Sequence, residues 1–445
     1  MSENSNGLRR IVFVAPSFAG ESLRSACAIM TLGNVELLGI CNHPFLNDDR
    51  SVFREVVCVD DTNDSTQLLE AAGLLRQKHG PLNRIVTTYE ILLEPVAQTV
   101  EALGLEGMSV ETVRRALNKS SLIATLRQAG IGVARSQICT DEASSRSFAL
   151  RLGFPLVLKP LTGSGGLATW SIHDNEQLDL ALVLTDPSPT RPLLIEECLN
   201  GQELCLDTIT IANEPRFYSL CVYRPSILQA LEDAAIQWRC VLPRDINDDR
   251  YRQFIVKGLD AVRALSVGDA MTHMEGFLHN DGRVCFTDAT LRPAGARIAP
   301  MLAYAYDIDP YRAWARAALD GAFDGPWTRK FAVGTVFLRS AGSGAIESID
   351  GFEIIERELK DAIVDVRLPR AGSRKASTYT GDGYVTVRHP ETTAVEAALD
   401  LISQTVRINY DNSELSISRK DEWTKRLQFY QFYKPAWEID SHTSI

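Results

Sequence analysis

The sequence predicts a mixed α/β protein built in three parts, and three patterns support this prediction. Residues 9–90 alternate short apolar runs with helical segments, which is typical of an open, mostly parallel sheet. Residues 132–324 change to longer strand-like runs and hairpins mixed with helices. Residues 326–445 hold short strand-like runs and one long helical segment at 391–406. A chain of 445 residues is long enough for two to four domains with ample cores.

Composition and charge argue against several classes of protein. The net charge is -11 without a basic tract, so nucleic acid is not an expected partner, although a local pocket can still bind small anions. No apolar run reaches the roughly eighteen residues that span a bilayer, and the N-terminal apolar run ends at Pro16 as a first strand would, not as a signal peptide. The nine scattered cysteines include no C-x-x-C pair, which predicts reduced thiols and a cytoplasmic location.

The first part has the elements of an α/β domain. Strand-like runs lie at residues 9–17, 35–42 and 83–90. Helical segments lie between them at 21–33 and 64–80, and a Gly-Pro pair ends the second of these. Strands separated by helices indicate parallel pairing.

Two further helices are expected between Ser109 and Gly130. Ser109 is a good first-turn cap, Asn118 and Lys119 mark the break before the second helix, and Gly130 ends it. The helix dipole does not favour a lysine at a helix start. Lys119 therefore makes more sense with an anion nearby.

The stretch GFPLVLKPLTGSGGLATW, residues 153–170, places Lys159 at the end of an apolar strand and a glycine-rich loop directly after it. The loop matches neither the P-loop nor the G-x-G-x-x-G pattern, and by itself such a loop is usually only a turn. Its backbone N–H groups can nevertheless bind a phosphate whose charge the lysine offsets. The candidate phosphate-binding residues are Lys159, Thr162, Gly163, Ser164, Gly165 and Gly166.

The stretch at residues 271–292 predicts two strands joined by an Asn-Asp-Gly turn at 280–282. Glu275 lies on the first strand and Asp288 on the second, each flanked by apolar residues. Two carboxylates that face one space repel each other unless a cation lies between them. Oxygen ligands favour a hard cation, and Mg²⁺ commonly links carboxylates to nucleotide phosphates. The alternative is two solvated strand residues.

The segment LLIEECLNGQE, residues 193–203, ends a strand and follows it with a short loop. Extended backbone offers the acceptor and the donor that an adenine needs, and a carboxylate can accept from two ribose hydroxyls. These glutamates could equally be surface charges if they stood alone. The candidates are Glu196, Glu197, Leu199 and Glu203.

Taken in order, these segments resemble the ATP-grasp superfamily, in particular its amino-acid and dipeptide ligases. NKSSLIATLRQAGI is similar to the D-K-x…A-G-[VI] segment, GFPLVLKPLTGSGG to the strand and phosphate lid, and THMEGFLHNDGRVCFTDATLRPAGARIAP to the T-H-x-E-F…x-E-x-N-x-R-x-x-G pattern. SIDGFEIIERELKDAIVDVRL resembles the C-terminal region of carboxylate–amine ligases. The resemblance covers nearly the whole chain.

The resemblance implies an ATP-grasp fold, in which two α+β subdomains clasp ATP. A Rossmann-like α/β domain would precede it at residues 1–110, and a small α+β domain would follow at 326–445. The ATP-grasp domain would span 111–325, with its lid at about 130–200.

The resemblance also implies roles for the candidate residues. Lys119 and Lys159 would hold the ATP phosphates, the backbone from Glu196 to Leu199 would frame adenine, and Glu203 would bind the ribose. Glu275, Asp288 and Thr290 would provide oxygen to Mg²⁺, or to Mn²⁺ in its place. Arg292 would grip the substrate carboxylate or acyl phosphate, which suits its guanidinium fork, and His273 would line the acceptor side.

Two positions depart from the family pattern. The second metal ligand is usually glutamate, whereas Asp288 is one methylene shorter, and Thr290 stands where asparagine is usual. Both still offer oxygen, but the departures put the number of metals and full activity in question.

The implied reaction is ATP-dependent ligation of a small-molecule carboxylate to an amine through an acyl phosphate, with release of ADP and phosphate. A homodimer is the family expectation. One alternative is a biotin-carboxylase-like enzyme that activates bicarbonate, although LRPAGARIAP lacks the R-x-Q-V-E-H continuation of that class. Another is a degenerate nucleotide-binding protein that has lost its chemistry.

Overall fold

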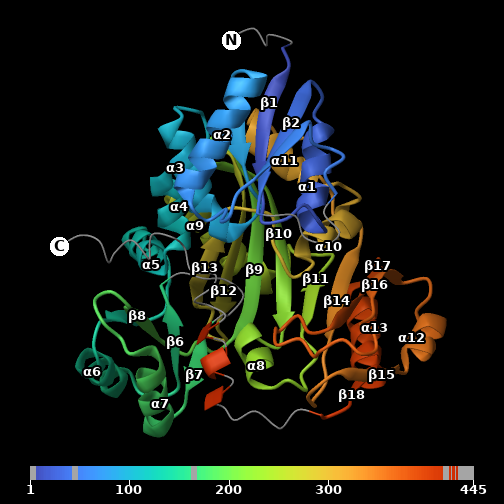
Figure 1. The fold of residues 1–445 in the computed structure, drawn as a ribbon. Coiled ribbons are helices and arrows are strands. Elements are labelled where there is room, and N and C mark those ends of the chain that lie inside the picture. The colour runs from blue at the N-terminus through green and yellow to red at the C-terminus, as the bar shows by residue number, and fades with distance from the viewer. Residues whose placement is uncertain are drawn as a thin grey trace.

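The first part of the chain folds into a four-stranded sheet flanked by helices (Figure 1). The computed structural model describes residues 7–42, 49–161 and 168–413, with 420, 421, 423–425, 427 and 428. The strand order is β3-β2-β1-β4 and every neighbouring pair is parallel, as the alternating pattern predicts. Beyond the predicted elements, the structure adds β3 and α3. The bounds are β1 Arg9–Val14, α1 Glu21–Met30, β2 Val35–Cys41, β3 Glu55–Cys58, α2 Ser65–His79, β4 Arg84–Val86, the 3-10 helix η1 Glu90–Leu92 and α3 Leu93–Ala102.

Two capped helices connect this sheet to the rest of the molecule. The Ser109 side chain accepts from the Thr112 N–H at the start of α4 (Val110–Leu117), and the Asn118 side chain accepts from the Ser121 N–H at the start of α5 (Lys119–Gln128). These caps satisfy N–H groups that have no partner inside a helix. The predicted break between the helices is therefore confirmed.

An antiparallel sheet of eight strands forms the centre of the molecule, in the order β13-β12-β9-β10-β11-β14-β17-β16. One face packs against α4, α5 and α9. The other packs against α10, α11 and the N-terminal sheet. The bounds are β9 Gln202–Ile211, β10 Glu214–Arg224, α8 Ile227–Glu232, β11 Arg239–Leu242, α9 Asp249–Leu265, β12 Ala270–Leu278, β13 Val284–Thr290, α10 Ile298–Tyr306, α11 Pro310–Asp320, β14 Ala332–Leu338, β16 Ile363–Arg367 and β17 Gly383–His389.

A smaller antiparallel sheet with the order β5-β8-β6-β7 lies beside one end of the central sheet (Figure 1). Its own apolar core includes Trp170 and, from near the C-terminus, Trp423, whose ring centroids are 5.9 Å apart. The C-terminal region therefore returns to this sheet. The bounds are β5 Ser136–Cys139, α6 Glu142–Leu152, β6 Leu156–Pro160, β7 Trp170–Ile172, α7 Asn175–Thr185 and β8 Leu193–Glu197.

The last part of the chain is joined to the centre through β14, β17 and β16, which extend the eight-stranded sheet. The predicted helix is α13 (Thr392–Thr405), which packs against β14 and β17. α12 (Phe352–Glu358) and the pair β15 (Ile346–Asp350) and β18 (Arg407–Tyr410) complete it. The domain bounds at 110 and 325 stay predictions. Among the described residues, no helix has the length and apolar character to cross a membrane.

Candidate active site

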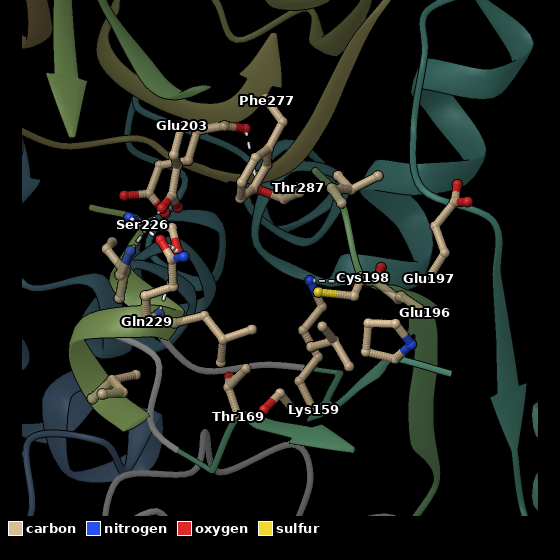
Figure 2. A pocket seen from close by; sticks show the side chains of 18 of the residues that line it. Lys159, Thr169, Glu196, Glu197, Cys198, Glu203, Ser226, Gln229, Phe277 and Thr287 are labelled. Carbon is tan, nitrogen blue, oxygen red and sulfur yellow. Dashed lines mark hydrogen bonds and ion pairs between the residues drawn. The ribbon is translucent and has the colours of Figure 1, made fainter. Parts of the chain in front are cut away.

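A cavity of about 460 Å³ lies between the small sheet, α8 and the end of the central sheet (Figure 2). Residues predicted from four separate segments of the sequence meet in it. The tertiary fold thus brings together what the sequence shows only as an ordered series. Its lining includes Lys119, Lys159, Glu196, Glu197, Leu199, Glu203, Glu275 and Asp288.

Both predicted phosphate-binding lysines are buried and paired with carboxylates. Lys159 Nζ lies 2.6 Å from Glu196 Oε2, and Lys119 Nζ lies 3.0 Å from Asp288 Oδ2. Burial alone would lower the pKa of Lys119, but the charges of Asp288, Glu90 and Glu196 outweigh it and raise that pKa. Lys119 is therefore a cation in the cavity wall, where the low dielectric strengthens its attraction for an anion, and Lys159 forms its ion pair in the same cavity wall.

The predicted adenine-binding segment follows β8. The Glu197 side chain is held away from Lys159 by Arg135, whose Nε lies 2.7 Å from Glu197 Oε2 (Figure 2). The Leu199 N–H donates to no group in the described part of the chain. Glu196 lines the cavity in its ion pair with Lys159, and beyond Glu197 the segment offers backbone groups to the cavity.

Glu203, predicted to bind ribose, is 7% exposed. Its Oε2 accepts from the Ile227 N–H, 2.7 Å away at the start of α8. Burial and the neighbouring charge of Glu275 raise the pKa of Glu203 to about 8. The loop before it passes close to β12: Gly201 has φ +145°, and an added Cβ would lie 2.4 Å from the Leu278 carbonyl oxygen.

The predicted carboxylate pair lies on neighbouring strands in direct register. Glu275 on β12 pairs with Asp288 on β13, and His273 pairs with Thr290. Burial raises the pKa of Asp288, as do the charges of Glu90 and Glu275, while Lys119 opposes the change. The Thr290 Oγ1 is buried without a hydrogen-bond partner among the described residues. The hairpin therefore presents two carboxylates and an unpartnered hydroxyl, all oxygen donors of the type that Mg²⁺ prefers.

A second cavity of about 200 Å³ adjoins the first and shares Glu275, Asp288 and Tyr379 with it. His273, Thr290 and Arg292 line this second cavity. Arg292 Nη2 lies 2.8 Å from Glu90 Oε2. The Arg292 guanidinium and the Glu90 carboxylate thus lie beside Glu275 and Asp288, the predicted cation ligands.

His273 is held between two carboxylates. Its Nδ1 lies 2.9 Å from Asp207 Oδ1 and its Nε2 lies 3.3 Å from Glu275 Oε1. Burial opposes protonation, but Cys205 and Asp207 hold the pKa of His273 well above its usual range. Burial also raises the pKa of the Cys205 thiol well above its usual range, so that group is neutral at neutral pH.

Sequence reasoning missed several residues at the site. Glu90 comes from the end of the predicted strand at 83–90, and nothing near it in sequence indicates that it meets Arg292. Tyr223 and Asp207 lie inside predicted strands, where the side facing the site is known only once the register is known. Thr162, Gly163, Ser164, Gly165 and Gly166 lie outside the described residues, so the predicted phosphate loop stays a prediction.

The fold is similar to that of ATP-grasp carboxylate–amine ligases, and the chain is similar in sequence to amino acid ligases. The crystal structure of the L-amino acid ligase from Bacillus licheniformis matches with a TM-score of 0.76 at 18% identity, over 91% of this chain and 99% of that one. The N5-carboxyaminoimidazole synthetase from Staphylococcus aureus complexed with ADP matches with a TM-score of 0.66 at 15% identity, over 90% and 100%. The predicted fold class is thereby confirmed.

The sequence comparison finds amino acid ligases among the relatives of this chain. The chain is 27% identical over 258 residues to the L-arginine-specific L-amino acid ligase of Bacillus subtilis, covering 57% of this chain and 61% of that one. It is 21% identical over 260 residues to the alanine–anticapsin ligase of the same organism, covering 55% and 54%. The alignments thus span little more than half of each relative. No protein-family model matches the chain.

Proposed function

We propose that this protein is an ATP-dependent carboxylate–amine ligase that joins amino acids or amino-acid-like substrates. The observation that carries the proposal is the junction of the two cavities at Glu275 and Asp288. The larger cavity has two lysines, each paired with a carboxylate, and a backbone segment suited to a nucleotide. The other has Arg292 beside Glu90 and suits a carboxylate and an amine.

ATP would enter the larger cavity by replacing existing ion-pair partners. Its phosphates would compete with Glu196 for Lys159 and with Asp288 for Lys119, and so would meet cations that are already ordered and desolvated. The Leu199 N–H would donate to an adenine ring nitrogen. Glu203 would accept from the ribose hydroxyls.

Mg²⁺ fits the residues present, because the hairpin offers two carboxylates and a hydroxyl that has no hydrogen-bond partner among the described residues. Glu275, Asp288 and Thr290 would hold it. When bound, the metal would neutralise charge on the ATP phosphates. Binding of the metal would also free Lys119 from Asp288 for the nucleotide.

The proposed reaction has two steps. A substrate carboxylate oxygen attacks the γ-phosphorus of ATP; the new O–P bond forms, the bond to ADP breaks, and an acyl phosphate results. The amine nitrogen then attacks the acyl carbon, the C–O bond to phosphate breaks, and the nitrogen loses a proton. Arg292 would hold the substrate carboxylate and, in the second step, offset the negative charge that develops on the acyl oxygen.

Glu90 has a part that the sequence does not suggest. Its carboxylate lies in the smaller chamber beside Arg292. It would accept a hydrogen bond from the incoming amine and direct the nitrogen toward the acyl carbon.

The names of the amino acid ligases among the relatives support amino acids as substrates. The homodimer and the cytoplasmic location stay predictions.

The test is release of ADP and phosphate from Mg-ATP in the presence of amino acids, singly and in pairs, with mass spectrometry of the products. A ligase gives ADP only with a particular pair and a product whose mass is the pair minus one water. ADP release that needs bicarbonate instead would favour the biotin-carboxylase-like alternative. Nucleotide binding with no turnover in any arm would contradict a working ligase.

A further inference from the structure

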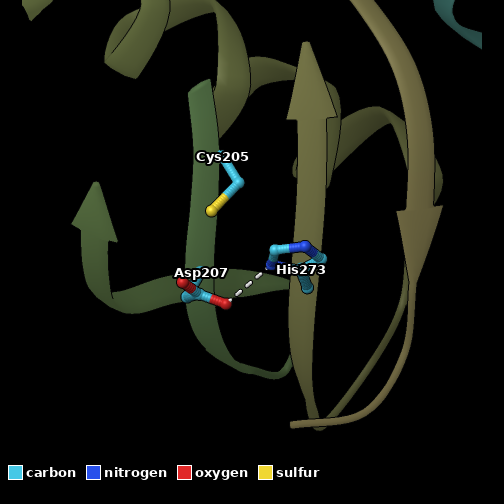
Figure 3. Close-up of side chains that lie close together, drawn as sticks. All are labelled: Cys205, Asp207 and His273. Atoms are coloured by element: carbon cyan, nitrogen blue, oxygen red, sulfur yellow. Dashed lines mark hydrogen bonds and ion pairs between the residues drawn. The ribbon is translucent and has the colours of Figure 1, made fainter. Parts of the chain in front are cut away.

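A buried polar cluster lies behind the presumed cation site, on the face of the central sheet that meets α10 and α11. Cys205 and Asp207 lie two residues apart on β9, and His273 lies opposite Asp207 on β12 (Figure 3). The same register places Glu275 opposite Cys205. Because side chains two residues apart share a face of a strand, Asp207, His273 and Glu275 form one continuous row.

The hydrogen bonds in this row run toward Glu275. A carboxylate can only accept, so the His273 Nδ1, 2.9 Å from Asp207 Oδ1, carries the hydrogen of that contact. The His273 Nε2 then faces Glu275 Oε1 at 3.3 Å, and the Tyr223 hydroxyl donates to the same oxygen at 2.9 Å. In the described part of the chain, Glu275 Oε2 has no hydrogen-bond partner. One oxygen of Glu275 is thus held and the other is left for a ligand.

Burial of the Asp207 carboxylate at this position costs folding free energy. Its side chain is fully buried, and its Oδ2 has no hydrogen-bond partner among the described residues. A buried carboxylate is tolerated when it is paired, and the described partner of Asp207 is the His273 ring, whose Nδ1 lies 2.9 Å from Asp207 Oδ1. Nothing in packing the sheet requires this charge.

We propose that Asp207 is a positioning residue for the cation site: it fixes His273, which together with Tyr223 fixes Glu275 with Oε2 directed to a divalent cation. This inference rests on the proposed function only in that Glu275 is a cation ligand. Outer groups that orient a metal ligand typically change metal affinity about 10- to 100-fold when they are removed. Asp207→Asn keeps the shape of the side chain but removes its charge.

The chain offers a matched control one residue away. Thr208 and Thr272 are hydrogen-bonded between the same two strands, on the opposite face of the sheet, and both are buried. Thr208→Val therefore removes a buried polar contact from the same pair of strands without touching the row that ends at Glu275. This variant measures how the loss of a buried polar contact alone changes stability and Mn²⁺ affinity.

The experiment is Mn²⁺ titration by electron paramagnetic resonance on the full chain with a non-hydrolysable ATP analogue, alongside binding of the analogue in EDTA and thermal unfolding. D207N should weaken Mn²⁺ binding at least about tenfold and leave metal-free binding of the analogue unchanged. T208V should lower the unfolding temperature and leave Mn²⁺ affinity unchanged.

A second variant separates action through His273 from a general loss of stability. If Asp207 acts through the ring, H273Q weakens Mn²⁺ binding to the same degree, and D207N/H273Q is no weaker than H273Q alone. If D207N does not fold, H273Q with T208V as its control makes the same prediction.

Two results would overturn the inference. One is unchanged Mn²⁺ affinity in D207N or, if that variant does not fold, in H273Q. The other is one tightly held zinc per chain that D207N loses, because Cys205, Asp207 and His273 would then be a metal site of their own. Wild-type protein that binds Mn²⁺ and the analogue but joins no substrates would contradict the ligase proposal and leave this inference standing.

Discussion

Replacement of Lys159 by methionine separates the structural and functional roles of the larger cavity. The Lys159 and Glu196 side chains are 9% and 5% exposed, with Nζ 2.6 Å from Oε2. Removing one partner of such a buried pair leaves an uncompensated charge and costs about 3–5 kcal/mol. K159M should therefore destabilise the small sheet, in which β6 pairs directly with β8.

The loss can be measured locally by amide hydrogen exchange followed by mass spectrometry. A loss of about 3 kcal/mol in the opening free energy speeds exchange of β6 and β8 amides about 150-fold. K159M/E196Q removes the unpaired charge and should return exchange most of the way to the wild-type rate.

ATP binding should not recover in the double variant. A hydrogen bond to a charged group contributes about 1.5–3 kcal/mol, so ATP affinity should fall about 10- to 150-fold in K159M and stay low in K159M/E196Q. Calorimetric titration with ATP measures it. Wild-type ATP affinity in the double variant would show that Lys159 is only the structural partner of Glu196 and would refute the assignment of the cavity to the nucleotide.

Three further changes test other parts of the site. R292A should raise the KM for the carboxylate substrate by at least about tenfold and leave ATP affinity unchanged, whereas a loss confined to ATP affinity would place Arg292 at the nucleotide. G201A should weaken ATP binding and lower stability by at least about 1 kcal/mol, because its Cβ would collide with the Leu278 carbonyl oxygen. Thermal unfolding with and without ATP measures both effects, and an unchanged unfolding temperature in both conditions would contradict the prediction. The folded pKa of Glu203, about 8, lies above the ordinary glutamate value of 4.5, so this group's contribution to stability is full below pH 4.5 and falls as pH rises toward 8. E203Q without nucleotide should flatten that slope in urea unfolding, and an unchanged slope would contradict the raised pKa.

The carboxylate pair could be predicted because the information is local. The turn at 280–282 makes the strands of Glu275 and Asp288 neighbours, so the two carboxylates are expected close together. The register that runs from the turn through Gly276 opposite Phe286 shifts between Gly276 and Glu275, and this irregularity, which the sequence does not show, places Asp288 opposite Glu275. Likewise Asn118 and Lys119 mark a helix break through the chemistry of their own backbone neighbours. These features depend on residues within about fifteen positions of each other.

Periodicity, caps and turns act over short distances, so the alternating α/β segment, the capped helices, the hairpin and the order of the predicted motifs could be read from the sequence alone. Only the tertiary structure decided that Arg292 meets Glu90, 202 residues away in sequence, and that Asp207 stands behind His273. These pairings depend on the order of strands in the central sheet and on the N-terminal sheet packed over it. Strand order is set by the summed burial of many apolar side chains, so no single stretch of sequence specifies it.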